Sequence, residues 1–237
     1  MYLTKKIING KEYYYARESK RVGKKVVSKN VAYLGANKKE AEMKMKTILE
    51  ERENSKNIVK ITYFVHGTTT DNEKDISSGW YDVELSELGI KQSIELKNQI
   101  KDKKFDVVFC SDLKRAVESA KLTFGKKTPI VIDKRLRECN YGKFNAKPSK
   151  IVEPMQEEAI TQRFPDGESY EDVKNRIENF LKFLKRSYNN KSVAIVAHKA
   201  PQLALDVLLN KKTWEQAFAE DWRKRKAWKP GWDYILT

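Results

Sequence analysis

The sequence predicts an α/β protein: a three-layer α/β/α domain with a mostly parallel sheet and helices on both faces, preceded by a small β-β-β-α module. Two observations lead to this prediction. From residue 58 onward, short apolar runs rich in β-branched residues alternate with stretches of helical composition. Before residue 58, extended segments of alternating character precede one helix-forming stretch. We therefore expect two domains, residues 1–57 and residues 58–237.

The N-terminal segment is expected to form three strands and then a helix. The Asn-Gly pair at residues 9–10 and Gly23 interrupt runs of β-forming residues, and both are suited to hairpin turns. The third strand is predicted to end at Gly35. Residues 36–56 are rich in Ala, Lys, Glu and Met, which is typical of a helix, and Asn37 is suited to cap it.

The larger domain is predicted from four buried strands and the helices that connect them. Short runs that are apolar along most of their length are typical of strands buried on both faces of a sheet. They are residues 58–65, 105–111, 129–133 and 192–198. The helical stretches are residues 86–101, 112–124, 169–188 and 200–210. Ligands of such sheets bind beyond the carboxyl ends of the strands, so we expect the functional site there.

The positive charge of the chain is unevenly distributed. The net charge is +15, and residues 1–57 hold 15 Lys and Arg against 7 Asp and Glu, a net of +8 in about a quarter of the length. An excess of this kind attracts polyanions such as nucleic acid. The alternative is a lysine-rich surface that serves solubility, and charge alone does not decide between them.

The composition limits the cellular environments and the kinds of cofactor that can be expected for this protein. No apolar run approaches the ~20 residues of a membrane span, and the first ten residues have no signal-peptide character. Cys110 and Cys139 are too few for a disulfide framework or a zinc signature, so we expect reduced, buried thiols. The prediction is a cytoplasmic protein without membrane, metal or cofactor; its oligomeric state is undetermined.

Both histidines of the chain stand at the ends of predicted strands. His66 follows the strand 58–65, and His198 closes the segment 192–198. Either one alone would be unremarkable. Because the carboxyl ends of parallel strands meet at one edge, we expect the two rings to share a crevice.

Two further side chains fit a site for an anion. Arg115 lies in the first turn of the helix predicted after the strand 105–111, where a guanidinium can grip an oxyanion in bidentate fashion. Glu138 lies in a loop after the strand 129–133. A carboxyl group beside an anion favours its protonated form, which suits a general acid. The alternatives are a surface arginine and a solvated glutamate.

The larger domain resembles the histidine phosphatase superfamily, which has the phosphoglycerate mutase-like fold. The family pattern around the nucleophile is RHGxTxxN, and this chain has "VHGTTTDN" followed by "DVELSELG". Further matches, in the same order as in the family, are "SDLKRAVESA", "RLRECNYGKF", "FPDGESYEDVKNRI" and "VAIVAH". The resemblance extends over about residues 58–210.

The resemblance implies a phosphatase acting on a phosphorylated small molecule through a phosphohistidine. His66 would be the nucleophile and Glu138 the general acid and base, while Arg115 and His198 would hold the phosphoryl oxygens. Gly67, Thr69 and Asn72 match loop positions that bind phosphate. No metal or cofactor is implied. A mutase would need an insertion that closes over the site, for which the sequence gives no basis.

One position departs from the family pattern. The residue before the nucleophile is Val65, where the family has arginine. Lys199, where the family usually has glycine, could supply a replacement charge; Arg137 and Lys143 are further candidates. Two interpretations follow. The domain is a phosphatase with a rearranged phosphate pocket, or a catalytically weakened protein that binds a phosphorylated ligand and has a regulatory role.

Three remaining segments have a suggested role. Trp80 and Tyr81, and residues 149–169, lie where this fold carries its substrate lid, so the aromatic rings either contact substrate or anchor a loop. The tail holds four of the five tryptophans and is expected to pack on the domain, a dimer contact being the alternative. They are Trp214, Trp222, Trp228 and Trp232.

Residues 1–57 also resemble, over a shorter stretch, the strand module at the N-terminus of some insertion-element transposases. This resemblance implies contact with nucleic acid through alternating aromatic and basic residues. They are Tyr13, Tyr15, Arg17, Arg21, Lys24 and Lys25. The alternative is that the tyrosines pack on the helix while the basic residues are only solvated.

Overall fold

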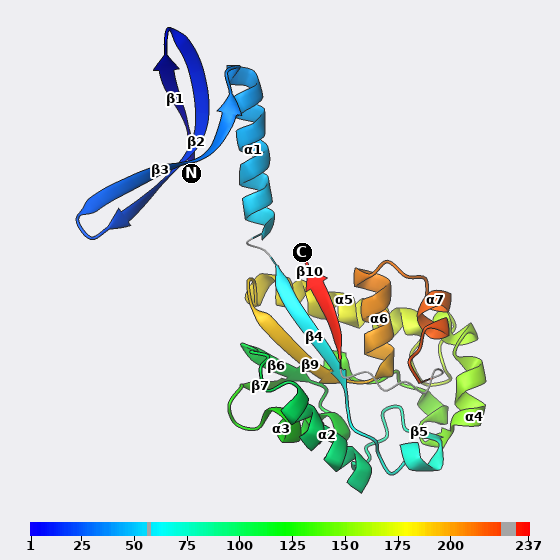
Figure 1. Cartoon of the computed structure of the whole chain (residues 1–237). Helices are drawn as coiled ribbons and strands as arrows, with labels where there is room; N and C mark the ends of the chain where they lie inside the picture. The colour runs from blue at the N-terminus through cyan, green and yellow to red at the C-terminus, as the bar shows by residue number, and fades with distance from the viewer. Residues whose placement is uncertain (56–57, 224–230) are drawn as a thin grey trace. The chain divides into compact units, whose positions relative to one another are not determined.

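The computed structural model describes residues 1–55, 58–223 and 231–237 and divides the chain into two compact units, Met1–Asn57 and Ile58–Thr237 (Figure 1). The first unit is a three-stranded antiparallel sheet with one helix. Its strands are β1 (Tyr2–Ile8), β2 (Lys11–Val22) and β3 (Lys25–Gly35), in that order, and its helix is α1 (Lys38–Ser55). The predicted β-β-β-α order is confirmed.

Local chemistry explains the turns of the first unit. Asn9 and Gly10 have φ of 50° and 74°, the left-handed values that a tight hairpin turn requires. The Asn37 side chain accepts a hydrogen bond from Glu40 N at 3.3 Å and so caps α1. Tyr14, Ala16, Leu34, Ala41 and Met45 form a small core between sheet and helix.

The second unit is built on a five-stranded sheet with the order β10-β4-β9-β6-β7. Four strands are parallel: β4 (Val59–Val65), β9 (Ser192–Ala197), β6 (Val107–Cys110) and β7 (Ile130–Ile132). The fifth, β10 (Trp232–Leu236), pairs with β4 in antiparallel fashion. The predicted mostly parallel sheet is confirmed. The edge strand β10 was not predicted; the tail packs on the domain by extending its sheet.

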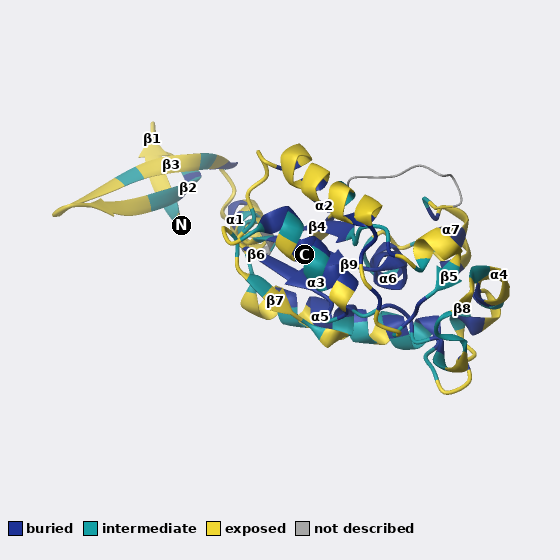
Figure 2. Ribbon diagram, turned by 90° about the horizontal axis from the view of Figure 1, so that it is seen from below, coloured by how far each residue is buried: buried dark blue, intermediate teal, exposed yellow. Residues whose placement is uncertain are grey.

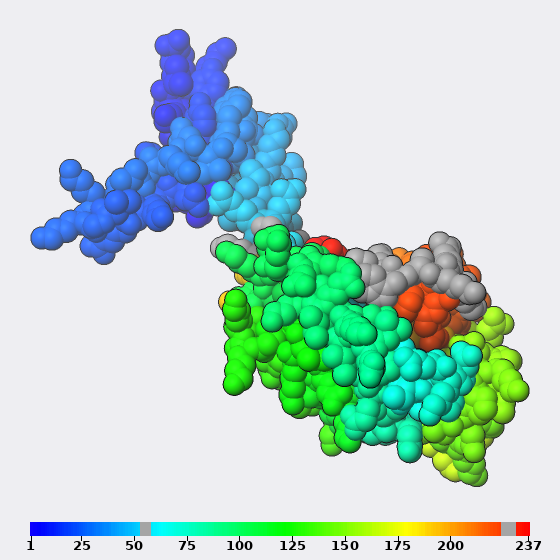
Figure 3. Space-filling view, turned by 60° about the horizontal axis from the view of Figure 1, so that its bottom comes forward, coloured from blue at the N-terminus to red at the C-terminus, as the bar shows by residue number. Residues whose placement is uncertain are grey.

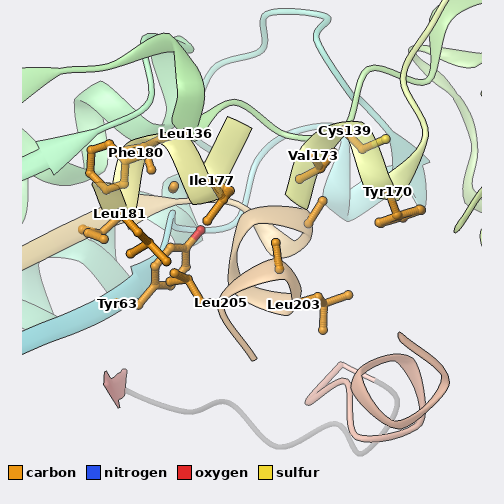
Figure 4. Packing of buried hydrophobic residues seen from close by; sticks show 14 of the residues in the cluster. Tyr63, Leu136, Cys139, Tyr170, Val173, Ile177, Phe180, Leu181, Leu203 and Leu205 are labelled. Carbon is orange, nitrogen blue, oxygen red and sulfur yellow. The ribbon is translucent and has the colours of Figure 1, made fainter. Parts of the chain in front are cut away.

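Helices cover both faces of this sheet, as expected for three layers (Figures 1 and 2). Helices α2 (Glu87–Gln99) and α3 (Lys114–Phe124) pack on the side of Phe64, Val108 and Val196. Helices α5 (Tyr170–Ser187), α6 (Lys199–Leu209) and α7 (Trp214–Ala219) pack on the side of Tyr63, Phe109 and Ile195. Figure 4 shows this second core, in which Tyr63 lies near Leu205 of α6.

Shorter elements connect the layers. The pair β5 (Ile76–Ser77) and β8 (Lys147–Pro148) joins two long loops, and α4 (Ser149–Val152) follows at once. Single 3-10 turns are found at Asn72–Lys74, Lys134–Leu136, Gly142–Phe144, Glu153–Met155 and Glu158–Ile160. Of these segments, Asn72–Lys74, β5, β8, α4 and the turn at Glu153 contribute residues to the cavity of the site.

Candidate active site

The two histidines meet at the carboxyl edge of the sheet. His66 follows β4 and His198 follows β9, and these strands are adjacent and parallel. The backbone N–H of His66 donates to Ala197 O at 3.0 Å, which continues the ladder to the last residue of β9. The ring centroids are 5.0 Å apart with the planes at 62°. The structure thus brings together two residues that are 132 positions apart in the sequence.

Hydrogen bonding fixes the tautomer of His66. Its Nδ1 lies 2.7 Å from Gly67 O, and a carbonyl oxygen only accepts, so Nδ1 carries the hydrogen and Nε2 keeps its lone pair. Desolvation of the ring, together with the charges of Arg115 and Arg223, lowers the pKa of His66 to about 3, although the Gly67 carbonyl opposes the shift. At neutral pH the ring is therefore uncharged, the form required of a nucleophile.

His198 is fully buried and held by its backbone. The Tyr63 hydroxyl donates to His198 O at 2.6 Å and accepts from His198 N at 2.9 Å. Neither ring nitrogen has a hydrogen-bond partner among the residues that the structure describes. Burial, followed by the charges of Arg115 and His66, holds the pKa of His198 well below its usual value. Unpaired buried nitrogens are costly, and an anion between the rings would accept from the protonated nitrogen of His198.

Arg115 is positioned by the loop in front of α2. It lies in the first turn of α3 and is 2% exposed. Its guanidinium donates to Gly79 O at 2.7 Å and to Tyr81 O at 3.0 Å. An arginine has five N–H donors in a planar fork. The two carbonyl contacts therefore orient the fork and leave donors for a ligand.

Glu138 is held at the N-terminus of α6. One carboxylate oxygen accepts from Cys139 N and Ala200 N, both at 2.9 Å, and the other accepts from Lys199 N at 3.1 Å. The side chain is 9% exposed and lines the same cavity as His66 and Arg115. Three backbone donors suit a carboxylate and fix its place beside the histidines.

Trp80 and Tyr81 do not line this cavity, contrary to the expected substrate contact. The Trp80 indole N–H donates to Glu138 O at 2.7 Å, and its ring lies under the Arg137 guanidinium at 4.6 Å. The Tyr81 side chain is 58% exposed, and its carbonyl orients Arg115. Both residues position the catalytic candidates through their neighbours. The loop-anchoring alternative describes them better.

The loop after His66 is also more internally bonded than the sequence suggests. Gly67 N donates to Ser119 Oγ at 3.0 Å, and a Cβ on Gly67 would stand 2.4 Å from Gly89 O, so this glycine allows close packing on α2. Thr69 and Asn72 bond each other: each backbone N–H donates to the other's side-chain oxygen at 3.1 Å. Of these three residues, only Asn72 lines the cavity.

The basic candidates for replacing the family arginine are tied to other partners. Lys199 donates to Gln156 at 2.9 Å and pairs with Asp221 at 3.1 Å; burial and the nearby Arg223 lower its pKa to about 8. Arg137 forms a bidentate pair with Asp112 at 2.7 and 2.6 Å. Lys143 is exposed and pairs with Asp166. The latter two do not line the cavity, whereas Lys199 does so at its edge.

A cavity of about 960 Å³ opens beside the histidines, and several of its residues were not predicted. Residues from the expected lid region, Ser149, Lys150 and Glu153, form one wall. Unpredicted lining residues include Thr68, Lys74, Gln92, Tyr141 and Arg223. A basic or aromatic residue in a loop or tail carries no local signal for its place in a cavity.

The tail divides its tryptophans between the core and the cavity. Trp214 is buried and donates to Glu171 at 2.7 Å. Trp222 and Trp232 line the same cavity as Val65, with their ring centroids 6.3 Å apart. Trp228 lies outside the described residues.

In the part of the chain that the structure describes, no helix is long and apolar enough to cross a membrane. No group of three or more His, Cys, Asp and Glu side chains within it could hold a metal ion.

Comparison with known proteins matches the second unit. The chain is 27% identical over 160 residues to phosphoserine phosphatase 1 of Hydrogenobacter thermophilus, covering 62% of this chain and 74% of that one. It is 32% identical over 146 residues to the phosphatase PhoE of Bacillus subtilis, covering 59% and 72%. The solved structure of a mycobacterial glucosyl-3-phosphoglycerate phosphatase superposes with a TM-score of 0.60 at 25% identity, covering 68% and 84%.

The matched family model, histidine phosphatase superfamily (branch 1), spans residues 63–229 and leaves the first unit outside. The comparisons do not support the resemblance of residues 1–57 to transposase modules, and that resemblance is withdrawn. The sequence motifs, the fold and the family match agree for the second unit. The chain therefore belongs to the histidine phosphatase superfamily, branch 1.

Proposed function

We propose that residues 58–237 hydrolyse phosphoric monoesters of small molecules through a phosphohistidine at His66. The observation that carries this proposal is the pair of uncharged imidazoles, 5.0 Å apart, of which one has a fixed tautomer and a free Nε2 lone pair. Arg115 and Glu138, both buried, line the same cavity as His66, and the His198 ring adjoins that of His66 without lining the cavity itself. A site that only bound phosphate would not need a nucleophile and an acid together.

In the first step, the Nε2 lone pair of His66 attacks phosphorus in line, and the bond from phosphorus to the ester oxygen breaks. Glu138, in its protonated form, gives its proton to the leaving oxygen, so an alcohol departs. The three backbone N–H groups around Glu138 stabilise the carboxylate that remains. Arg115 and His198 hold the non-bridging oxygens, where negative charge develops.

In the second step, water attacks the phosphohistidine. Glu138 takes a proton from this water, the bond between phosphorus and Nε2 breaks, and inorganic phosphate leaves. The protonated Glu138 and neutral His66 are then ready for another cycle. Throughout, Gly67 O accepts the Nδ1 hydrogen and keeps the ring in its reactive orientation.

The alternative proposal is a weakened enzyme that mainly binds a phosphorylated ligand. It is favoured by Val65, whose apolar side chain lines the cavity where the family has a guanidinium. A lost charge-assisted contact of about 1.5–3 kcal/mol lowers the rate about tenfold to a hundredfold if it acts only in the transition state.

Hydrolysis of 4-nitrophenyl phosphate by wild type, His66→Ala and Val65→Arg separates the two proposals. Phosphatase activity predicts turnover by wild type and its loss in His66→Ala. No turnover by wild type, but turnover by Val65→Arg, supports the binding protein. Equal activity of wild type and His66→Ala contradicts the phosphohistidine.

A second candidate function concerns residues 1–57, for which we propose binding of single-stranded nucleic acid. The specific observation is the face of the sheet that α1 does not cover. Cross-strand partners share a face, and the pairs Lys6–Tyr13, Tyr2–Arg17 and Tyr15–Tyr33 all lie on this open face. Tyr14 and Ala16 point to the helix instead. Of the tyrosines at 13–15, only the middle one therefore packs on the helix.

The side chains on this face are suited to a single nucleic-acid strand, whose bases can stack on the tyrosines and whose phosphates attract the basic groups. Tyr33 is 56% exposed and its ring lies 5.3 Å from that of Tyr15 and 6.3 Å from that of Tyr13. The Arg17 Nε donor is buried and has no partner among the described residues. Alternation along β2 places Glu12 and Glu18 on the opposite face, so the charge here is basic. Exposed aromatics beside basic side chains bind bases by stacking and phosphates by charge.

Gel retardation of single-stranded DNA by the full chain tests this proposal. Wild type is expected to retain the strand at low salt and to lose it progressively as salt rises. The variant Arg17→Ala/Tyr33→Ala should bind at least about tenfold more weakly, since stacking on one ring alone is worth ~1–3 kcal/mol. Lys46→Ala, in an exposed ion pair on α1, is the matched control. Equal retention by both variants contradicts the proposal, and equal affinity for duplex DNA contradicts the stacking mode.

A further inference from the structure

The phosphate pocket has an apolar residue, and no cationic side chain, at the end of β4. Val65 is half-buried, lines the cavity and packs against the core on the Tyr63 side of the sheet. On the other side, Arg115 supplies one guanidinium from α3. A phosphoryl group bound beside His66 would therefore have a strong donor fork on one side and an isopropyl group on the other.

Among the described residues that line the cavity, five are cationic: Lys74, Arg115, Lys150, Lys199 and Arg223. Lys74 and Lys150 belong to exposed stretches of the outer loops. The Lys199 ammonium is already paired with Asp221 and Gln156. The remaining candidate is Arg223, from the segment after α7. Its side chain is 39% exposed, but unlike the lysines Lys74 and Lys150 it carries the planar fork that suits phosphate.

We propose that Arg223 binds the phosphoryl group and takes the place of the guanidinium that position 65 lacks. The inference rests on the proposed phosphatase function and assigns a new residue to its pocket. In this chain the second fork would come from the C-terminal segment. The local sequence around the nucleophile would therefore not reveal it.

The hydrogen bonds and ion pairs of the Arg223 guanidinium leave some of its N–H donors available to a ligand. Its Nε and its Nη2 each lie 3.4 Å from Asp221 Oδ2, and Nη2 is 3.9 Å from Glu153 Oε1, whereas charge-assisted hydrogen bonds are usually 2.7–2.9 Å long. By contrast, the Arg137 fork is closed on Asp112 at 2.6 and 2.7 Å. Two carboxylates at these distances keep the Arg223 guanidinium near the cavity without saturating its donors.

The charge of Arg223 reaches the reacting groups. After burial and Arg115, its charge is among the causes that lower the pKa of His66. The pKa of Arg223 itself is raised, against its burial, by Asp221 first and then by Tyr141 and Glu138. Arg223, His66, Glu138 and Tyr141 also line one continuous cavity. The electrostatic coupling and the geometry thus agree.

Asp221 positions this arginine. Its carboxylate is buried, accepts from Arg223 N at 3.1 Å and pairs with Lys199 at 3.1 Å. Asp221 therefore fixes the turn that follows α7. The same carboxylate binds the Lys199 ammonium, which is then not available to the phosphoryl group. Lys199 contributes to the pocket by holding Asp221, and Arg223 contributes the donors.

The test measures kcat/KM for 4-nitrophenyl phosphate and the inhibition constants of inorganic phosphate and vanadate. We expect Arg223→Ala to lower kcat/KM and to weaken inhibition by about tenfold to a hundredfold, with Arg223→Lys in between. Arg163→Ala is the matched control, since Arg163 is exposed and pairs with Asp172 away from the cavity. Thermal melting of each variant separates a loss of fold from a loss of binding.

The decisive variant is Val65→Arg/Arg223→Ala. If both positions serve one phosphoryl group, Val65→Arg should restore most of the activity lost in Arg223→Ala. If Arg223→Ala behaves like Arg163→Ala, the inference is wrong. Should wild type show no turnover, the proposed function fails by itself. Calorimetric binding of inorganic phosphate then still tests Arg223, and unchanged affinity in Arg223→Ala overturns its role.

Discussion

The charge states of single residues in the crevice are set by burial more than by their immediate partners. His66 and His198 both lie where protonation would put a cation beside Arg115 in a poorly solvated place. Both rings are therefore neutral until an anion arrives. An entering phosphate would reverse the sign of the local field and could use His198 as a donor.

The depressed pKa of His66 makes the stability of the second unit depend on pH. In the unfolded chain the pKa of the ring is its usual 6.5, whereas in the folded chain the pKa is about 3. The unfolded state thus binds more protons between these values, and the free energy of unfolding should fall as pH drops through this window. One proton corresponds to a slope of at most about 1.4 kcal/mol per pH unit.

Urea unfolding between pH 3.5 and 7 for wild type and His66→Asn measures this contribution. Carboxylates contribute equally to both proteins, so the difference between the two curves isolates the histidine. We expect the wild-type curve to be the steeper one below pH 6.5. Parallel curves would show that His66 is not desolvated.

The proposed role of Glu138 as proton donor predicts that its effect on kcat depends on the leaving group. Glu138→Gln should lower kcat for an alkyl phosphate by about 10²–10⁴, because an alkoxide is a poor leaving group without a proton. For 4-nitrophenyl phosphate the loss should be much smaller. The matched control, Glu158→Gln, lies in an exposed turn. An equal loss for both substrates would indicate that Glu138 positions α6 and donates no proton.

At the scale of elements, the strand β10 links the tail to the centre of the sheet. It pairs with β4, the strand that leads into His66, and places Trp232 opposite Tyr63. Tyr234 is 3% exposed; its hydroxyl donates to Asp206 at 2.9 Å and accepts from Gln202 at 3.0 Å on α6. The tail thus joins β4 to the helix that starts at His198.

This network predicts the effect of removing one hydroxyl. Tyr234→Phe should lower the free energy of unfolding by about 1–3 kcal/mol, because Gln202 and Asp206 lose a buried partner. Ile235→Ala, at a 55% exposed neighbour, should change it by less than about 0.5 kcal/mol. Chemical denaturation of the three proteins gives both values. Equal stability of Tyr234→Phe and wild type would show that water replaces the hydroxyl.

At the scale of the whole molecule, the chain consists of two units that each bury a core of their own. The core of the first unit is small, and its β2–β3 hairpin extends beyond the helix, leaving Val22, Val26 and Val27 exposed (Figures 1 and 3). A module of about 55 residues is near the lower limit for independent folding. Its stability therefore depends on a few side chains.

Separate cores predict separate responses to mutation. Leu34→Ala should cost the first unit about 2–5 kcal/mol, enough to unfold it, since Leu34 is 2% exposed in its core. Nucleic-acid retention should be lost, while kcat/KM for 4-nitrophenyl phosphate stays at the wild-type value. Circular dichroism and both assays on one preparation measure this. A parallel loss of phosphatase activity would show that the second unit requires the first.

Much of the architecture was predictable because its determinants are local. The runs 58–65 and 192–198 are apolar along most of their length, and the Asn-Gly turn at residues 9–10 has a strong backbone preference, so strands and hairpin follow from neighbouring residues. The strand β10 could not be predicted in this way. Its five residues pair with β4 some 170 positions earlier, and no short-range pattern encodes that contact.

The sequence by itself determined which residue types could perform the chemistry: two histidines at strand ends, an arginine in a first turn and a glutamate in a loop. Only the tertiary structure decided what each side chain is free to do. It pairs Lys199 with Asp221, lets the Trp80 indole donate a hydrogen bond to the carbonyl of Glu138, and places Arg223 in the lining of the cavity. The physical reason is that hydrogen bonds and ion pairs between distant segments depend on distances of a few ångströms, which side-chain identity along the chain does not specify.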